Sequence, residues 1–138
     1  MTKKLNLANK NRDSYKTSKD VIASLKYALS GLIYCFRTTR NFRIQIFLGL
    51  IVLIFCFIFN CNLNEFLIII STILSVLILE LLNTAIESIV DLNVKMRFNK
   101  LAKISKDCSA ASVLLASLNS IFVAAFVFFP KIRLLLFS

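Results

Sequence analysis

The chain has 138 residues, of which 58% are hydrophobic, with 17 Lys and Arg against 7 Asp and Glu and no histidine. This apolar content exceeds that of ordinary soluble domains, and two glycines with one proline are too few for the turns of a many-stranded sheet. The lack of histidine excludes the commonest general base and metal ligand at neutral pH. We therefore expect one small all-α domain whose chemistry comes from carboxylates, lysines, hydroxyls or thiols.

The first forty residues divide into two parts. Residues 1–18 are rich in Lys, Asn, Ser and Thr and have no apolar period, which predicts a mobile basic tail. Over residues 19–40 apolar side chains recur at helical spacing between Lys and Arg, which predicts an amphipathic helix at a membrane surface. Packing of this helix on a soluble partner is the alternative. Residues 19–138 are expected to form a single membrane-embedded domain.

Three apolar stretches further along the chain approach the length of a membrane span. A helix that crosses a bilayer needs about 20 residues, so the shorter stretches must include flanking residues. The predicted spans are residues 43–60, 66–86 and 108–129. With the surface helix, they define an all-α integral membrane protein with three transmembrane helices.

Basic residues alternate along the chain in a way that fits three spans. Residues 1–43 carry ten Lys and Arg, residues 60–65 none, residues 95–106 five and residues 131–138 two. By the positive-inside rule, the N-terminus and the loop at 91–107 are cytoplasmic, while the C-terminus lies outside. The basic residues behind the net charge of +10 then either bind anionic lipid headgroups or only determine the topology. We do not expect nucleic-acid binding.

Carboxylates gather where the second span emerges and the third begins. Four of the seven lie there, at Glu80, Glu87, Asp91 and Asp107. At about 100° per residue, Glu80, Asn83 and Glu87 share one helical stripe with Asp91. Carboxylates near the hydrocarbon are costly and usually face a bundle interior, a partner charge or a bound ion. This stripe is therefore the strongest candidate for a functional site.

The position of each group along the stripe indicates a role. Glu80 lies among leucines, a setting that suits a proton acceptor, and Glu87, nearer the water, is placed to bind a hard cation through oxygen ligands. Lys106 and Asp107 open the third span, and a lysine beside carboxylate-bound Mg²⁺ is a common arrangement for gripping nucleotide phosphates.

Two other interpretations are open at this point. Glu87 and Asp91 could simply pair with Lys95, Lys103 or Lys106 at a solvated helix end. The spacing alone also does not distinguish a kinase from an ion-coupled carrier. A carrier, however, usually has its carboxylates near the bilayer midplane and shows internal repeats.

The residues of the stripe also resemble a known family. Residues 80–91 read ELLNTAIESIVD, residues 101–107 read LAKISKD, and an Ala/Ser-rich span follows. This pattern resembles the signature of the small integral-membrane diacylglycerol kinase and undecaprenol kinase family of bacteria. The resemblance runs from about Lys26 to Ile132 and includes YALSG at 27–31 and RNFR at 40–43.

The resemblance implies an ATP- and Mg²⁺-dependent lipid kinase of the bacterial inner membrane. Such an enzyme transfers the γ-phosphate of ATP to the hydroxyl of diacylglycerol or undecaprenol, in phospholipid or lipid-carrier metabolism. It is active as a homotrimer whose sites, at the cytoplasmic face, are shared between neighbouring subunits.

Matched residue by residue, the resemblance implies roles for individual positions. Glu80 matches the catalytic base that takes the proton from the lipid hydroxyl, and Ala110 also matches a position at the lipid substrate. Glu87 matches a metal-binding carboxylate. The positions that match ATP-binding residues are Tyr27, Asn83, Glu87, Lys106 and Asp107, with Arg97, Phe98 and Asn99 in the cytoplasmic loop.

One position departs from the family pattern. Similar members carry a glutamate just before the Arg-Asn-Phe stretch, where it matches a second metal ligand, and here that residue is Thr39. A threonine hydroxyl is a weak, neutral ligand, so we expect lower Mg²⁺ affinity unless water or ATP oxygens complete the coordination. A catalytically weakened or silent membrane scaffold is the alternative that this departure favours.

The charge distribution yields a test of topology. With the native cysteines replaced by serine, Asn99→Cys in the 91–107 loop should react with a membrane-impermeant thiol reagent only after the cells are permeabilised, because the loop is predicted to be cytoplasmic. Labelling of this cysteine in intact cells would contradict the predicted orientation.

Overall fold

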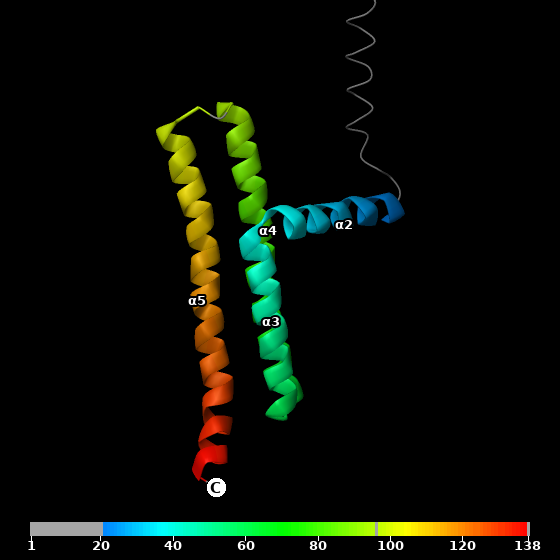
Figure 1. Ribbon diagram of the computed structural model, residues 1–138, viewed down its shortest axis with the longest axis vertical. Helices are drawn as coiled ribbons and strands as arrows, with labels where there is room; N and C mark the ends of the chain where they lie inside the picture. The colour runs from blue at the N-terminus through cyan, green and yellow to red at the C-terminus, as the bar shows by residue number, and fades with distance from the viewer. Residues whose placement is uncertain (1–20, 96, 138) are drawn as a thin grey trace, which may run out of the picture. The chain divides into compact units, whose positions relative to one another are not determined.

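The computed structural model describes residues 21–95 and 97–137, and within these ranges all regular secondary structure is helical. Figure 1 shows the four helices, α2 (Val21–Thr38), α3 (Arg40–Ile58), α4 (Leu63–Val94) and α5 (Lys100–Phe137). The predicted all-α fold is therefore confirmed. The predicted tail over residues 1–18 lies outside the described residues.

The chain divides into two compact units, Met1–Ile33 and Tyr34–Ser138, and α2 crosses the boundary between them. The helix predicted over residues 19–40 is found over Val21–Thr38 and ends where Thr39 adopts an extended conformation before α3. Apolar side chains along α2 are largely exposed. Its placement on a membrane surface stays a prediction.

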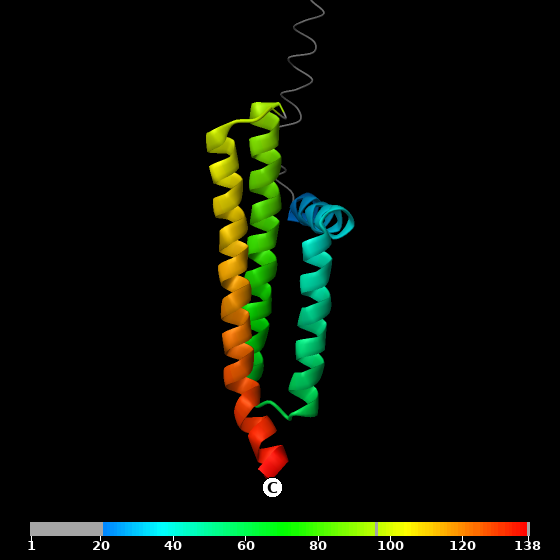
Figure 2. The ribbon, with the colours of Figure 1, turned by 60° about the vertical axis from the view of Figure 1, so that its left-hand side comes forward.

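In the second unit, three helices are long and apolar enough to cross a membrane: α3, α4 and α5. Helices α4 and α5 run side by side in opposite directions, and α3 packs against α4 (Figures 1 and 2). At 1.5 Å per residue, the 32 residues of α4 extend about 48 Å, whereas a hydrocarbon core is about 30 Å thick. The helix is thus longer than the predicted span at 66–86, and part of it must extend beyond the hydrocarbon.

The short turn between α3 and α4 is defined by local hydrogen bonds. Asn60 takes a left-handed conformation (φ 49°), and the N–H of Cys61 donates to the carbonyl of Cys56 at 2.9 Å, which closes the end of α3. Asn62 and Glu65 form a capping box at the start of α4, each side chain accepting from the other's backbone N–H at 2.9 and 2.8 Å. These contacts fix where α4 begins.

Packing near this turn draws the three helices together. Cys56, Ile69 and Val127, one from each helix, form a buried cluster. A Cβ on Gly49 would lie 3.0 Å from Cγ2 of Ile73, so the glycine allows α3 and α4 to approach closely. Because α3 is held against α4 here, Gln45, one turn away on α3, comes to lie beside the middle of α4.

Candidate active site

Glu80 is the most deeply buried charged residue described, with 2% of its surface exposed. It lies on α4 facing α3, where Gln45 Nε2 donates a hydrogen bond to Glu80 Oε2 at 3.3 Å. The hydroxyl of Thr84, one turn further along α4, donates to the backbone carbonyl of Glu80 and not to its carboxylate. A carboxylate held among apolar helices by one long hydrogen bond is costly to keep charged, which is typical of a functional group.

Asn83 connects the stripe on α4 to α5. Its side chain is buried, Oδ1 accepts from Ser109 Oγ at 2.6 Å, and Nδ2 donates to Glu87 Oε1 at 3.2 Å. The amide therefore fixes one oxygen of Glu87 relative to α5. Glu87 itself is half-buried, so its carboxylate remains accessible.

Lys106 and Asp91 form the next contact along the same two helices. Lys106 Nζ lies 3.1 Å from each oxygen of Asp91, and both side chains are about one-third exposed (36% and 35%). This is the pairing that the alternative interpretation gave for Asp91. Asp107, the predicted neighbour of Lys106 in nucleotide binding, is exposed. At this exposure an ion pair stabilises a fold only slightly, so Lys106 can exchange Asp91 for another anion at little cost.

A cleft of about 470 Å³ opens beside this ion pair, where α4 turns into α5. The lining includes Asp91, Lys106 and Asp107 together with the loop residues Arg97, Phe98 and Asn99. The Phe98 ring is 87% exposed, and Arg97 is also exposed. Asn99 has a structural role as well, because its Oδ1 accepts the N–H groups of Leu101 and Ala102 and so caps α5. Most of the predicted nucleotide-binding residues thus lie around one opening.

Three other predicted positions take no part in the hydrogen bonds and the ion pair described above. Tyr27 is exposed on α2, within the first compact unit. Thr39 is half-buried between α2 and α3, and its backbone N–H donates to the carbonyl of Cys35 at 2.8 Å. Ala110 is exposed, next to Ser109.

The side chains available as ligands indicate whether the site could hold a bare metal ion or a metal–nucleotide complex. Within residues 21–95 and 97–137, no group of three or more His, Cys, Asp or Glu side chains is arranged to bind a metal ion. Glu87 supplies one carboxylate, while Asn83 turns its N–H toward Glu87 and its amide oxygen toward Ser109. Mg²⁺ commonly takes one or two carboxylates and completes its shell with substrate phosphates and water. These residues therefore fit a Mg²⁺–nucleotide complex better than a bare ion.

Sequence reasoning identified Glu80, Asn83 and Glu87 but did not pair them with two residues that the fold brings to them. Gln45 is 35 positions away from Glu80 and Ser109 is 26 positions away from Asn83. Each is a polar residue within an apolar span, and that pattern is the one signal by which they could have been found.

Comparisons with known proteins give a family and several relatives for the chain. The family model described as prokaryotic diacylglycerol kinase matches residues 26–128. A diacylglycerol kinase of Synechocystis is 37% identical over 121 residues, covering 88% of this chain and 69% of that protein. The undecaprenol kinase of Bacillus subtilis is 36% identical over 109 residues, covering 79% of this chain and 88% of that protein. A diacylglycerol kinase of Haemophilus influenzae is 36% identical over 104 residues, covering 74% and 87% respectively.

Proposed function

Since the chain belongs to the prokaryotic diacylglycerol kinase family and is a multi-pass bacterial membrane lipid kinase, we propose that it transfers the γ-phosphoryl group of ATP to a lipid hydroxyl with Glu80 as the base. The observation that carries the proposal is the buried Glu80 carboxylate, from which one polar stripe leads through Asn83 and Glu87 to the cleft beside Lys106. The relatives include a diacylglycerol kinase and an undecaprenol kinase, so the proposed substrate class is a membrane lipid with a free hydroxyl, diacylglycerol or undecaprenol.

In the proposed reaction, the lipid hydroxyl approaches Glu80 from the bilayer. Glu80 takes the hydroxyl proton as the alcohol oxygen bonds to the γ-phosphorus, and the bond from that phosphorus to the β-phosphate oxygen breaks to release ADP. Phosphoryl transfer depends mainly on positioning and charge stabilisation, so one base and a few fixed charges suffice.

Charge stabilisation falls to residues on the water side of Glu80. Lys106 would leave Asp91 to bind ATP phosphate oxygens, and Asp107 and Asn83 complete the proposed ATP contacts with Arg97, Phe98, Asn99 and Tyr27. Glu87 would hold Mg²⁺ through its carboxylate, with Thr39 at the family's second ligand position. When bound, the ion would neutralise negative charge on the phosphates.

The proposal includes an assembly and an orientation. We place the chain in the bacterial inner membrane as a homotrimer with shared sites, its N-terminus in the cytoplasm and its C-terminus outside. The distribution of Lys and Arg supports this orientation. Glu87 is half-buried and accepts a hydrogen bond from Asn83, which supports a site that ATP and a neighbouring subunit complete.

Substitution of Glu80 tests the assigned base. Glu80→Gln keeps the size of the side chain but removes the proton acceptor, so turnover should fall at least about a hundredfold while ATP binding is retained. Phosphorylated lipid is measured with detergent-purified protein, diacylglycerol or undecaprenol, and labelled ATP. Glu65→Gln, the same change in the first turn of α4, is the control and should keep turnover. Normal turnover in Glu80→Gln would remove Glu80 from the mechanism.

Substitution of Lys106 tests the nucleotide side of the site. Lys106→Ala removes a charge assigned to the phosphates, so the KM for ATP should rise roughly tenfold or more, with little change in the KM for lipid. Lys131→Ala, which breaks the other ion pair of α5, with Glu65, serves as control. A selective loss of lipid affinity in Lys106→Ala would show that this face binds the lipid instead.

The threonine at position 39, where similar family members have a glutamate, yields a prediction about the Mg²⁺ dependence of activity. Thr39→Glu adds a carboxylate where the family has one, so a lower Mg²⁺ concentration should give half-maximal activity. Thr38→Glu adds the same charge one residue earlier, on an exposed side chain, and should not change the Mg²⁺ dependence. High activity of the parent at low Mg²⁺ with no gain in Thr39→Glu would mean that ATP and water already complete the coordination.

A further inference from the structure

Glu80 has one side-chain partner among the described residues, and that partner belongs to a different helix. Gln45 of α3 donates its amide N–H to Glu80 Oε2 at 3.3 Å, and the other carboxylate oxygen, Oε1, accepts no hydrogen bond from the described residues. The two oxygens of the proposed base are therefore not equivalent. One is held by α3, and the other is left for a ligand.

The contact with Glu80 uses only one of the two polar atoms of the Gln45 side chain. Its own oxygen, Oε1, is buried and has no hydrogen-bond partner in the part of the chain that the structure describes. A buried acceptor without a donor destabilises the folded state, so buried polar groups without partners need an explanation other than stability. An unbranched apolar side chain of similar length would fill the same space without this penalty.

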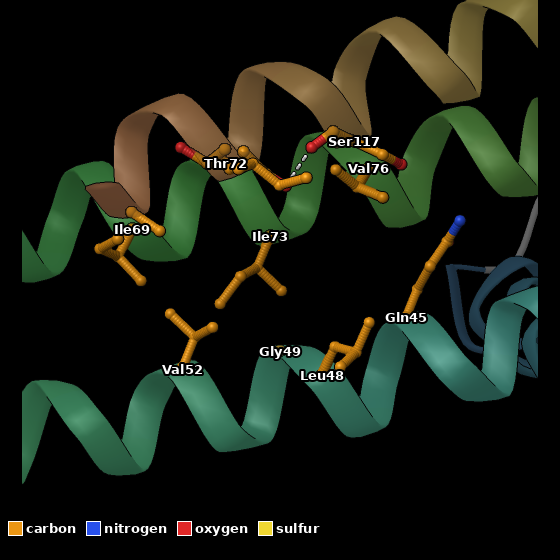
Figure 3. Close-up of a pocket in the computed structure, with 12 residues that line it drawn as sticks. Gln45, Leu48, Gly49, Val52, Ile69, Thr72, Ile73, Val76 and Ser117 are labelled. Atoms are coloured by element: carbon orange, nitrogen blue, oxygen red, sulfur yellow. Dashed lines mark hydrogen bonds between the residues drawn. The ribbon is translucent and has the colours of Figure 1, made fainter. Parts of the chain in front are cut away.

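Among the residues that the structure describes, none donates a hydrogen bond to the oxygen of Gln45. Figure 3 shows Gln45 reaching from α3 toward α4 beside a cavity of about 170 Å³ between α3, α4 and α5. The hydroxyls that line the cavity bond to carbonyls of their own helices, Thr72 to Ile68 at 2.7 Å, Ser117 to Val113 at 2.9 Å and Ser120 to Ser117 at 2.7 Å.

The orientation of the Gln45 amide is set by the carboxylate. If the amide were reversed, its oxygen would face Glu80 Oε2, and with the carboxylate ionised, as a base must be, the two acceptors would repel each other. The N–H must therefore point at Glu80 even though the Gln45 oxygen then lacks a partner. The glutamine is thus arranged to serve Glu80 rather than to stabilise the cavity.

We propose that Gln45 is a positioning residue for the Glu80 base, an inference that rests on the proposed function. By donating to Oε2, Gln45 holds the carboxylate in one orientation, with Oε1 directed to the proton of the lipid hydroxyl. A general base must lie within hydrogen-bond reach of the proton it removes, so this orientation acts on turnover and not on ATP binding. Gln45 itself does not take up the proton.

The test uses an almost isosteric variant of the full-length protein. Gln45→Met keeps the length of the side chain but removes the N–H donor, so kcat should fall roughly tenfold, the scale of a lost hydrogen bond to a charged group. The KM for ATP should stay within about twofold of the parent value, and the thermal midpoint should not fall, because the partnerless oxygen is removed as well. Thr72→Val, which removes another polar group of the same cavity, is the matched control and should keep kcat.

A double-variant cycle separates positioning from a general structural effect. If Gln45 acts through Glu80, Gln45→Met should change the residual turnover of Glu80→Gln by less than about twofold. A further tenfold loss in the Glu80→Gln background would show that Gln45 acts elsewhere and would overturn the proposal, as would parental kcat in Gln45→Met alone. Loss of folded protein in both Gln45→Met and Gln45→Leu would assign Gln45 a structural role and would also overturn the proposal.

The cycle also separates this inference from the proposed function. If Glu80→Gln alone kept the turnover of the parent protein, Glu80 would not be the base. Both the proposed mechanism and the positioning role of Gln45 would then be wrong. Impaired turnover in Glu80→Gln together with parental turnover in Gln45→Met removes only the positioning role.

Discussion

The structure of this site depends on the free-energy cost of a carboxylate between apolar helices. Glu80 is almost fully buried near the middle of α4, where water cannot solvate its charge. Gln45 of α3 donates a hydrogen bond to it, and Gly49, one turn along α3, allows α3 to lie close to Ile73 on α4. Interhelical hydrogen bonds of polar side chains in membranes stabilise by only about 0.6 kcal/mol on average. The contact with Gln45 therefore cannot offset the burial of Glu80, and function is the better reason for it.

Much of the fold followed from composition and periodicity. Three long apolar stretches and the scarcity of glycine and proline predict helices, because a chain with so few turn residues lacks the turns of a many-stranded sheet. The helix ends were harder to place. Helices α4 and α5 extend beyond the predicted spans, because hydropathy marks where the hydrocarbon begins, whereas a helix ends only where a cap or a left-handed residue such as Lys95 stops it.

The candidate site was predictable along one helix and not between helices. Glu80, Asn83 and Glu87 lie on one stripe because 3.6 residues make a turn, a rule that needs no knowledge of packing. Their partners Gln45 and Ser109 depend on the register of α3 and α5 against α4, which is set by close contacts such as Gly49 against Ile73. The comparisons with lipid kinases favoured a kinase over a carrier, the choice that spacing alone had left open.

The two ends of the α4–α5 pair are secured in different ways. At the Asn62 end, a capping box, a closed turn from α3 and the ion pair of Glu65 with Lys131 at 2.9 Å all act on the same few residues. At the opposite end, the two helices are joined by a turn and by the pair of Asp91 with Lys106, whose side chains are about one-third exposed. Local opening therefore costs least where the cleft lies. The two helices are thus held most firmly at the Asn62 end, and under the proposed function a nucleotide would enter and leave at the opposite end while the packing around Cys56 stays intact.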